Sequence, residues 1–373
     1  MSFRSGLLWK VALVLVLLTI PFSLSAAAGR SVKIGVAGPM TGSAAFDGKM
    51  IARGAALALE QFKSAGKLAR YNVQMVVEDD KSDPKEAAAI ANKFVGDNDL
   101  MAVVGNYNSS CTLAAAPILT KAGITQISPG SSSPRITGFS DYLFRTQLTD
   151  AANGMAVAEW AAESGFKKAA IIYENSDYGK GLQEVYAAAF PKQGRQIVAT
   201  ETYLSGQTSD FTATLTKVKA AGADVLLLGS LYNEGALIGK QAKQLGLRLT
   251  AFGAGLNTEA FTQLGKDAVE GWHVVGAIDF DSSDPKIQAF VQAFKKKYGD
   301  ELDPYAAQSY DAAMLLLAAL DKVGPDRAKI QQFVFKVKAF PGITGQIEFV
   351  KGDVLTKPTR YLVKNGKLIS VQK

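Results

Sequence analysis

The sequence predicts an α/β protein built from two doubly wound, parallel-sheet lobes. Strand-like and helix-like segments alternate along most of the chain, and the same order begins again after Asp150. Helices of about 10–15 residues between short apolar strands are typical of a parallel sheet with helices on both faces. About 345 residues remain once an N-terminal signal is set aside, which is long for one core and suits two lobes.

The first 28 residues have the pattern of a removable export signal. Arg4 and Lys10 give a positive start, residues 11–20 are almost wholly apolar, and residues 25–28 are small. This apolar run is shorter than the roughly 20 residues that cross a bilayer, so an uncleaved anchor is the weaker alternative. No cysteine lies near the cleavage region. We therefore expect an exported, soluble mature protein without a lipid anchor.

The elements of the two lobes follow from apolar runs and helical periodicity. In the first half, strands are expected at 32–36, 72–78, 101–104 and 124–127, and helices at 49–63, 84–95 and 112–121. After Asp150, helices are expected at 151–163, 179–190, 211–220 and 234–245, and strands at 169–173, 196–201, 225–229, 249–253 and 272–276.

The last part of the chain returns to helices and then to strands. Helices are expected at 285–298, 304–323 and 327–337, followed by a β-rich tail over 345–371. Asn365-Gly366 predicts a hairpin between 359–364 and 367–371. This order implies that the chain crosses between the lobes more than once.

Charge and residue usage argue against several classes of function. The formal charge is +7, and it falls to +5 without Arg4 and Lys10, with basic residues spread too evenly for a nucleic-acid surface. Cys111 is the only cysteine and His273 the only histidine, which leaves little for a disulfide, a zinc site or a histidine-dependent triad. The sequence also lacks a Gly-x-Ser-x-Gly elbow, a dinucleotide fingerprint and a P-loop. We expect no enzyme activity, no cofactor and no metal.

Several short segments carry a more specific signal. They are IGVAGPMTG at 34–42, EDDKSDP at 78–84, VVG at 103–105 followed by Ser109-Ser110, ISPGSSSP at 127–134, FRT at 144–146 and YENSDYGKG at 173–181. In this order and spacing they resemble the leucine/isoleucine/valine-binding family of periplasmic solute receptors that serve ABC transporters. The resemblance covers essentially the whole mature chain and implies the type I periplasmic binding protein fold. It also implies lobes formed by 30–149 with 278–352 and by 150–277 with 353–373, joined by a three-stranded hinge.

Two loops of the first lobe suit a carboxylate ligand. Open α/β sheets bind ligands beyond the carboxyl ends of their strands, where loops 106–112 and 128–134 are rich in hydroxyl groups. Free N–H groups at helix N-termini favour anions. The resemblance implies that Ser109, Gly130, Ser131 and Ser132 hold the ligand's carboxylate. The alternative is that Ser109 only caps the following helix.

Aromatic residues are expected to cover the rest of the ligand. The resemblance gives Tyr178 of the second lobe this role, together with Tyr232, or Leu231 if the register differs by one residue. Phe46 and Tyr107 are candidates for lining the side-chain pocket from the first lobe. Each of these aromatic residues could equally belong to the core.

One departure from the family bears on the ligand. The family's amino-acid receptors place a carboxylate after a second-lobe strand to pair the α-ammonium, and Gly255 stands there in this chain. A buried ammonium without a partner is costly. Asp150 could replace that carboxylate, although aspartate there also suits a helix N-cap, and Asp279 and Glu234 are further candidates.

The expected function is therefore capture of a small solute in the periplasm by hinge closure, followed by delivery to an ABC permease in the inner membrane. The solute is expected to carry a carboxylate and to be a branched-chain or other amino acid, or an aliphatic or aromatic organic acid. The protein is expected to act as a monomer. The alternative is a ligand-sensing module that presents its bound state to a receptor, because one fold can serve both tasks.

Overall fold

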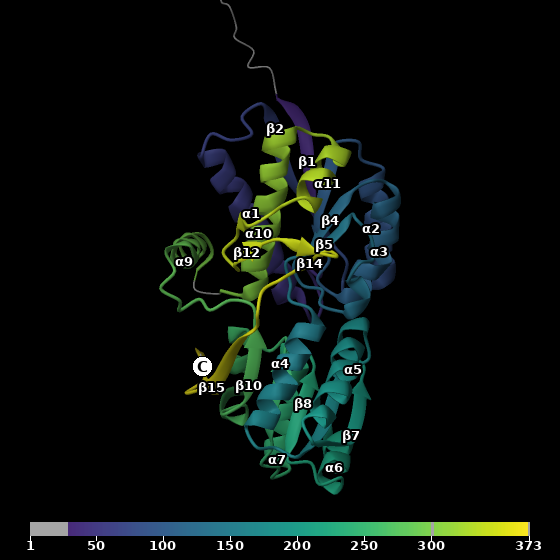
Figure 1. Ribbon diagram of the computed structural model, residues 1–373, viewed down its shortest axis with the longest axis vertical. Coiled ribbons are helices and arrows are strands. Elements are labelled where there is room, and N and C mark those ends of the chain that lie inside the picture. Colours follow the sequence, from purple (N-terminus) through teal and green to yellow (C-terminus); the bar gives the residue numbers. More distant parts are fainter. Residues whose placement is uncertain (1–28, 300–301, 372–373) are drawn as a thin grey trace, which may run out of the picture.

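A computed structural model describes residues 29–299 and 302–371. The predicted export signal, residues 1–28, lies outside the described residues. Figure 1 shows two α/β lobes stacked along the long axis of the molecule. None of the helices in the described part of the chain is long and apolar enough to cross a membrane.

The first lobe is built on a seven-stranded sheet in the order β13-β14-β5-β4-β3-β1-β2. Its strands are parallel except for the β13–β14 pair. They are β1 (Arg30–Gly38), β2 (Tyr71–Asp79), β3 (Leu100–Gly105), β4 (Thr125–Ser128), β5 (Leu143–Arg145), β13 (Phe349–Val350) and β14 (Asp353–Val354). One face packs on α1 (Ala45–Ser64), α10 (Pro304–Val323) and α11 (Arg327–Phe335), with α9 (Pro285–Tyr298) beside α1. The other face packs on α2 (Pro84–Val95) and α3 (Ser109–Lys121).

The second lobe repeats this plan with the order β16-β15-β10-β9-β8-β6-β7. Its strands are β6 (Lys168–Glu174), β7 (Gln196–Tyr203), β8 (Val225–Gly229), β9 (Thr250–Ala254), β10 (His273–Gly276), β15 (Thr359–Lys364) and β16 (Lys367–Ser370). Helices α4 (Asp150–Glu163) and α5 (Asp177–Lys192) cover one face. Helices α6 (Thr212–Ala220), α7 (Tyr232–Gln244) and α8 (Glu259–Gly265) cover the other. A small sheet of β11 (Phe340–Pro341) and β12 (Gln346–Ile347) and two 3₁₀ turns complete the lobes.

Local sequence explains these elements. Strands β3 and β8 are buried at every position, as expected for central strands of a sheet covered on both faces. Several helices begin at a side chain that accepts a backbone N–H, among them Asp83, Ser176 and Asp303. The predicted hairpin is confirmed: β15 and β16 pair antiparallel around Asn365 and Gly366, which both have positive φ.

The chain crosses between the two sheets three times, after β5, after β10 and after β14. The predicted fold is confirmed, but the last lobe boundary falls later than expected. Asp353 pairs with Arg145 in the first sheet, so β14 belongs to the first lobe. The third crossing therefore follows Val354 instead of falling between 352 and 353.

Candidate ligand-binding site

A narrow cleft with a free volume of about 20 Å³ lies between the lobes, close to the carboxyl ends of the central strands. None of its lining residues carries a formal charge; they are Tyr107, Asn108, Ser109, Gly130, Ser132, Gln147, Asn153, Tyr178, Leu231, Ala254, Gly255 and Tyr305. The cleft therefore presents hydroxyl groups, amides and aromatic rings.

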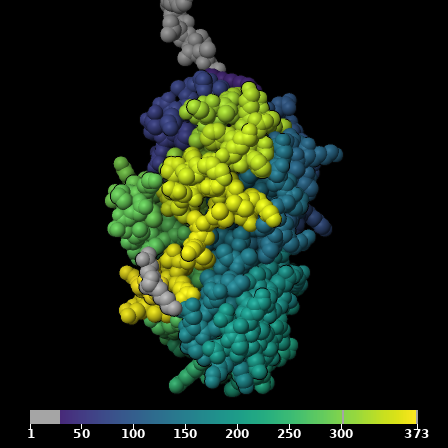
Figure 2. Space-filling model, viewed as in Figure 1, coloured from purple at the N-terminus to yellow at the C-terminus, as the bar shows by residue number. Residues whose placement is uncertain are grey.

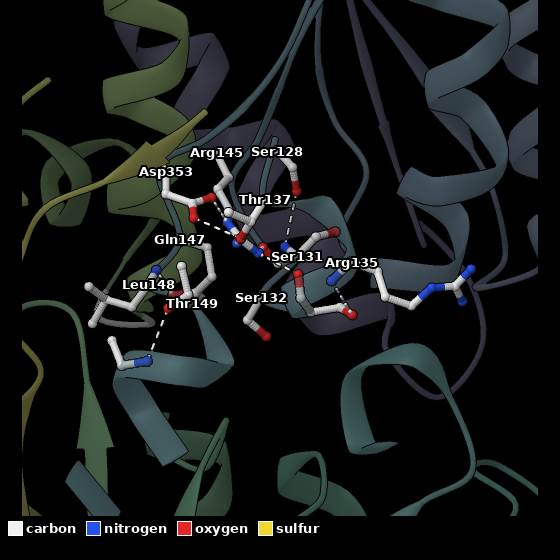
Figure 3. Close-up of polar contacts among 12 residues, drawn as sticks. Ser128, Ser131, Ser132, Arg135, Thr137, Arg145, Gln147, Leu148, Thr149 and Asp353 are labelled. Carbon is white, nitrogen blue, oxygen red and sulfur yellow. Dashed lines mark hydrogen bonds and ion pairs between the residues drawn. The ribbon is translucent and has the colours of Figure 1, made fainter. Parts of the chain in front are cut away.

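Ser109 and Ser132 give the first-lobe side of the cleft its hydroxyl groups. Ser109 is the first residue of α3, and its Oγ accepts the N–H groups of Ser132 and Ser133 at 3.2 Å each. In the described part of the chain its hydroxyl hydrogen has no recorded acceptor, so it is available to a ligand. The Ser132 hydroxyl points away from Arg145 (Figure 3). Both serines are thus placed to donate to a carboxylate.

The neighbouring positions of the same loop have different roles. Ser131 is fully buried, and its Oγ bonds to the Tyr107 carbonyl at 3.0 Å and to the Thr112 hydroxyl at 2.7 Å. Its side chain therefore holds the loop and does not line the cleft. Gly130 does line the cleft, and a Cβ there would come within 2.6 Å of the Tyr107 ring. Glycine lets the loop lie directly on this ring.

Arg145 fixes the loop from behind (Figure 3). It is fully buried, and its Nε donates to Asp353 Oδ1 at 2.7 Å. Its Nη1 donates to the Ser133 carbonyl at 2.8 Å, and its Nη2 donates to Thr137 Oγ1 at 2.7 Å. The sequence analysis gave this arginine no role, although an arginine at the end of an apolar strand indicates a buried charge that needs a partner.

The second lobe covers the cleft with Tyr178 and Leu231. The Tyr178 hydroxyl donates to the Ala254 carbonyl at 3.0 Å and lies 3.4 Å from the Ser230 carbonyl. Leu231 lines the cleft, whereas Tyr232 packs edge-on against Phe46 with ring centroids 6.2 Å apart. Neither Phe46 nor Tyr232 belongs to the lining.

Position 255, where the resemblance places a partner for an ammonium, carries no carboxylate. Gly255 has φ +74°, and a Cβ there would lie 2.4 Å from the Tyr178 hydroxyl. An acidic side chain at 255 is therefore incompatible with this position of Tyr178.

The three other carboxylates considered for this role all lie outside the lining. Asp150 is fully buried beside the Ser132 hydroxyl, and it faces Gly181. Burial raises its pKa to about 7, and the Ser132 hydroxyl and Arg145 offset part of this rise. Glu234 accepts from Ser205 and Gly206, and Asp279 accepts from its own loop.

Polar contacts join the lobes beside the cleft. The Ser110 hydroxyl donates to Asp177 Oδ2 at 2.8 Å, and Arg135 forms an ion pair with the same carboxylate. On another side, the Asn233 amide donates to the Ser43 carbonyl at 2.7 Å. On the face shown in Figure 2, the lobes are in direct contact along their junction. The two lobes are therefore in contact on more than one side of the cleft.

The sequence profile of the family described as "Periplasmic binding protein" matches residues 31–363. The chain belongs to the periplasmic binding protein family. A relative from Pseudomonas aeruginosa, named leucine-, isoleucine-, valine-, threonine-, and alanine-binding protein, is 32% identical over 339 residues, which cover 89% of this chain and 90% of the relative. The names of such relatives describe binding proteins and not enzymes, as predicted.

Solved structures of other periplasmic binding proteins share the fold. The branched-chain amino acid transporter substrate binding protein LivJ from Streptococcus pneumoniae, in complex with isoleucine, superposes with a TM-score of 0.84 at 29% identity and covers 92% of this chain and 100% of its own. A solute binding protein from R. palustris, in complex with benzoate, gives a TM-score of 0.84 at 23% identity, covering 91% of this chain and 95% of its own. The second likeness concerns the fold alone.

Proposed function

We propose that this protein is the periplasmic solute-binding component of an ABC importer, and that its solute is a small carboxylic acid without an α-ammonium group. Family membership and the names of the relatives support the transport role. The bound, closed form would be the one that the permease in the inner membrane recognises.

The observation that carries the choice of solute is the uncharged lining of the cleft. Ser109 and Ser132 supply hydroxyl donors beside the N-terminus of α3. A helix N-terminus favours an anion, so a carboxylate can bind here although no cationic side chain lines the cleft. The side chains that line the cleft include no carboxylate to pair an ammonium. The Tyr178 hydroxyl donates to the Ala254 carbonyl at 3.0 Å, and the acceptors that remain for an ammonium are uncharged. An α-ammonium here would be buried without a charged partner, which is costly.

A thermal-shift comparison of leucine with its 2-oxo acid, 4-methyl-2-oxopentanoate, tests this choice. A ligand that binds only the folded protein raises Tm as saturation increases. The comparison extends to other amino acids with their deaminated acids, and to benzoates. We expect stabilisation by acids and none by the matched amino acids. Stabilisation by leucine but not by its 2-oxo acid would contradict the proposed solute class.

A further inference from the structure

The Ser132 hydroxyl has a buried carboxyl group as its neighbour. Asp150 begins α4, where the chain has just crossed between the lobes for the first time, and its side chain is fully buried. Its backbone N–H donates to the Ser132 carbonyl at 2.7 Å, and its carboxyl lies beside the Ser132 hydroxyl. Ser132 lines the cleft, whereas Asp150 does not. The Ser132 hydroxyl therefore lies between a buried acid and the space for a ligand.

Helix capping does not account for Asp150. Thr149 caps α4, because its Oγ1 accepts the N–H of Ala152 at 3.0 Å. An acid in the first turn complements the helix dipole, but an exposed acid would do so without the cost of burial. Instead α5 lies directly against the carboxyl, since a Cβ at Gly181 would come within 2.7 Å of Asp150 Oδ2. Its contact with the Ser132 hydroxyl is the feature that distinguishes this acid.

The groups that face Asp150 do not hold its negative charge. Among the described residues, the cation that stabilises this charge is Arg145 of β5, and its nitrogens already donate to other groups of the first lobe. The charge of Asp150 also raises the pKa values of Tyr178 and Tyr186 on α5 and of Tyr305 on α10. The Tyr178 and Tyr186 hydroxyls donate to backbone carbonyls. Burial therefore prevails and raises the pKa of Asp150 to about 7.

The other charged or titratable neighbours on the elements packed around Asp150 leave this balance unchanged. Arg135 and Asp177, from the 3₁₀ turn and the helix on either side of Gly181, form an ion pair with each other. His273 of β10 stacks on Phe252, and burial lowers its pKa to about 4, so it is neutral near pH 7. Strands β8 and β9 carry no charged residue.

The protonation state of Asp150 determines what the Ser132 hydroxyl can offer to a ligand. An ionised carboxylate only accepts hydrogen bonds, so it takes the hydroxyl hydrogen of Ser132 and leaves an oxygen lone pair facing the cleft. A neutral carboxyl can donate to Ser132 Oγ, which frees the hydroxyl hydrogen for a carboxylate in the cleft. An ionised Asp150 would also repel that carboxylate across the serine side chain. Both effects weaken the binding of an anion when Asp150 loses its proton.

We infer that Asp150 is a positioning residue that must hold a proton for tight binding of a carboxylate at Ser132, so that capture of the solute takes up a proton from solution. This inference rests on the proposed function, because it takes the solute's carboxylate to lie at Ser132. The sign follows from linkage. A bound anion favours the neutral form of Asp150, so affinity is highest below about pH 7 and falls as pH rises above it.

Calorimetric titration of 4-methyl-2-oxopentanoate, or of benzoate if the oxo acid does not bind, tests this coupling. Both acids are ionised at pH 6 and at pH 8. One linked proton should raise Kd roughly 10-fold between these two pH values. Titrations at pH 8 in two buffers with different enthalpies of ionisation count the proton directly, and uptake should approach about one proton per ligand. An equal Kd at both pH values with no proton uptake would overturn the inference.

Two variants assign the linked proton. Asp150→Asn keeps the size of the side chain and cannot ionise, so its Kd should be the same at pH 6 and pH 8, without proton uptake. Glu174→Gln is the matched control, since Glu174 is also buried with a pKa raised to about 7 but lies outside the lining. It should keep the roughly 10-fold change of the wild type.

The outcomes separate the possible roles. If Asp150 only supported the fold, Asp150→Asn would change Kd by the same factor at both pH values and keep the pH dependence, which would overturn the inference. The proton count on the wild-type protein decides the matter if this variant does not fold. An acid that binds with a Kd independent of pH would contradict the inference alone. Failure of every acid to bind at either pH would contradict the proposed function itself.

Discussion

Substituting two adjacent serines of the 128–134 loop is expected to have opposite effects on ligand affinity and on stability. The Ser132 side chain lines the cleft, where its hydroxyl lies beside the Asp150 carboxyl and offsets part of the rise in the pKa of that group. The Ser131 hydroxyl bonds to Tyr107 and Thr112 inside the lobe. Ser132→Ala therefore tests the binding role, and Ser131→Ala is its control one residue away.

The magnitudes follow from these bonds. A hydrogen bond from a hydroxyl to a carboxylate contributes about 1.5–3 kcal/mol, so Ser132→Ala should raise Kd roughly 10- to 150-fold. It should change the free energy of unfolding by about 1 kcal/mol or less at pH 6, where the neighbouring Asp150 carboxyl is mostly neutral. Ser131→Ala leaves buried partners unsatisfied and should cost about 1–3 kcal/mol of stability. Its Kd, measured while the protein is folded, should stay within about 2-fold of the wild type.

The assay combines urea unfolding with calorimetric titration of the tightest acid from the thermal-shift comparison. Both are carried out at pH 6, below the raised pKa of the neighbouring Asp150 carboxyl, so that this group is mostly neutral in every variant. An unchanged Kd in Ser132→Ala would refute the placement of the carboxylate. A large loss of affinity in folded Ser131→Ala would show instead that the loop as a whole, and not the Ser132 hydroxyl, decides binding.

Three further predictions concern the surroundings of the cleft. The folded-state pKa of Asp150 is raised from 3.8 to about 7, so the free energy of unfolding of the wild type falls as pH rises from about 4 to 7. In urea unfolding, the stability of Asp150→Asn relative to the wild type should increase by roughly 2–4 kcal/mol between pH 4 and pH 8. A stability difference that does not change with pH would contradict this. Arg145→Met leaves Asp353 buried without its charged partner and should cost about 3–5 kcal/mol; an unchanged Tm would exclude Arg145 as the support of the loop. Ser110→Ala removes the hydrogen bond to Asp177 that joins the two lobes. It should raise Kd roughly 2- to 10-fold and leave the Tm of the free protein nearly unchanged. An unchanged Kd would show that this contact does not stabilise closure.

The sequence predicted the fold well because its strands are apolar runs with clear ends. Helix starts were less accurate: α3 was expected to begin at 112 and begins at Ser109, since small polar residues in the first turn carry no apolar periodicity. The same limit explains the choice between Leu231 and Tyr232. Adjacent residues at the start of α7 point in different directions, and only the three-dimensional contacts show which one faces the cleft.

Burial of charged groups could not be predicted from the sequence. Asp47 stands in the first turn of a helix and Asp303 before a proline, positions where aspartate is usually exposed and stabilises a helix end. Their burial depends on the packing of α1 against α10. Arg145 was predicted only as part of a family segment, because its partner Asp353 is 208 residues away in the sequence.

The measurement that tests the account most directly compares one acid with its primary amide. The acid is the one that gives the largest thermal shift, and both Kd values are obtained by calorimetric titration. A cleft that holds a carboxylate through the Ser109 and Ser132 hydroxyls should bind the acid roughly 10-fold or more tightly than the amide, which carries no charge. Equal or tighter binding of the amide would contradict a carboxylate site at these serines.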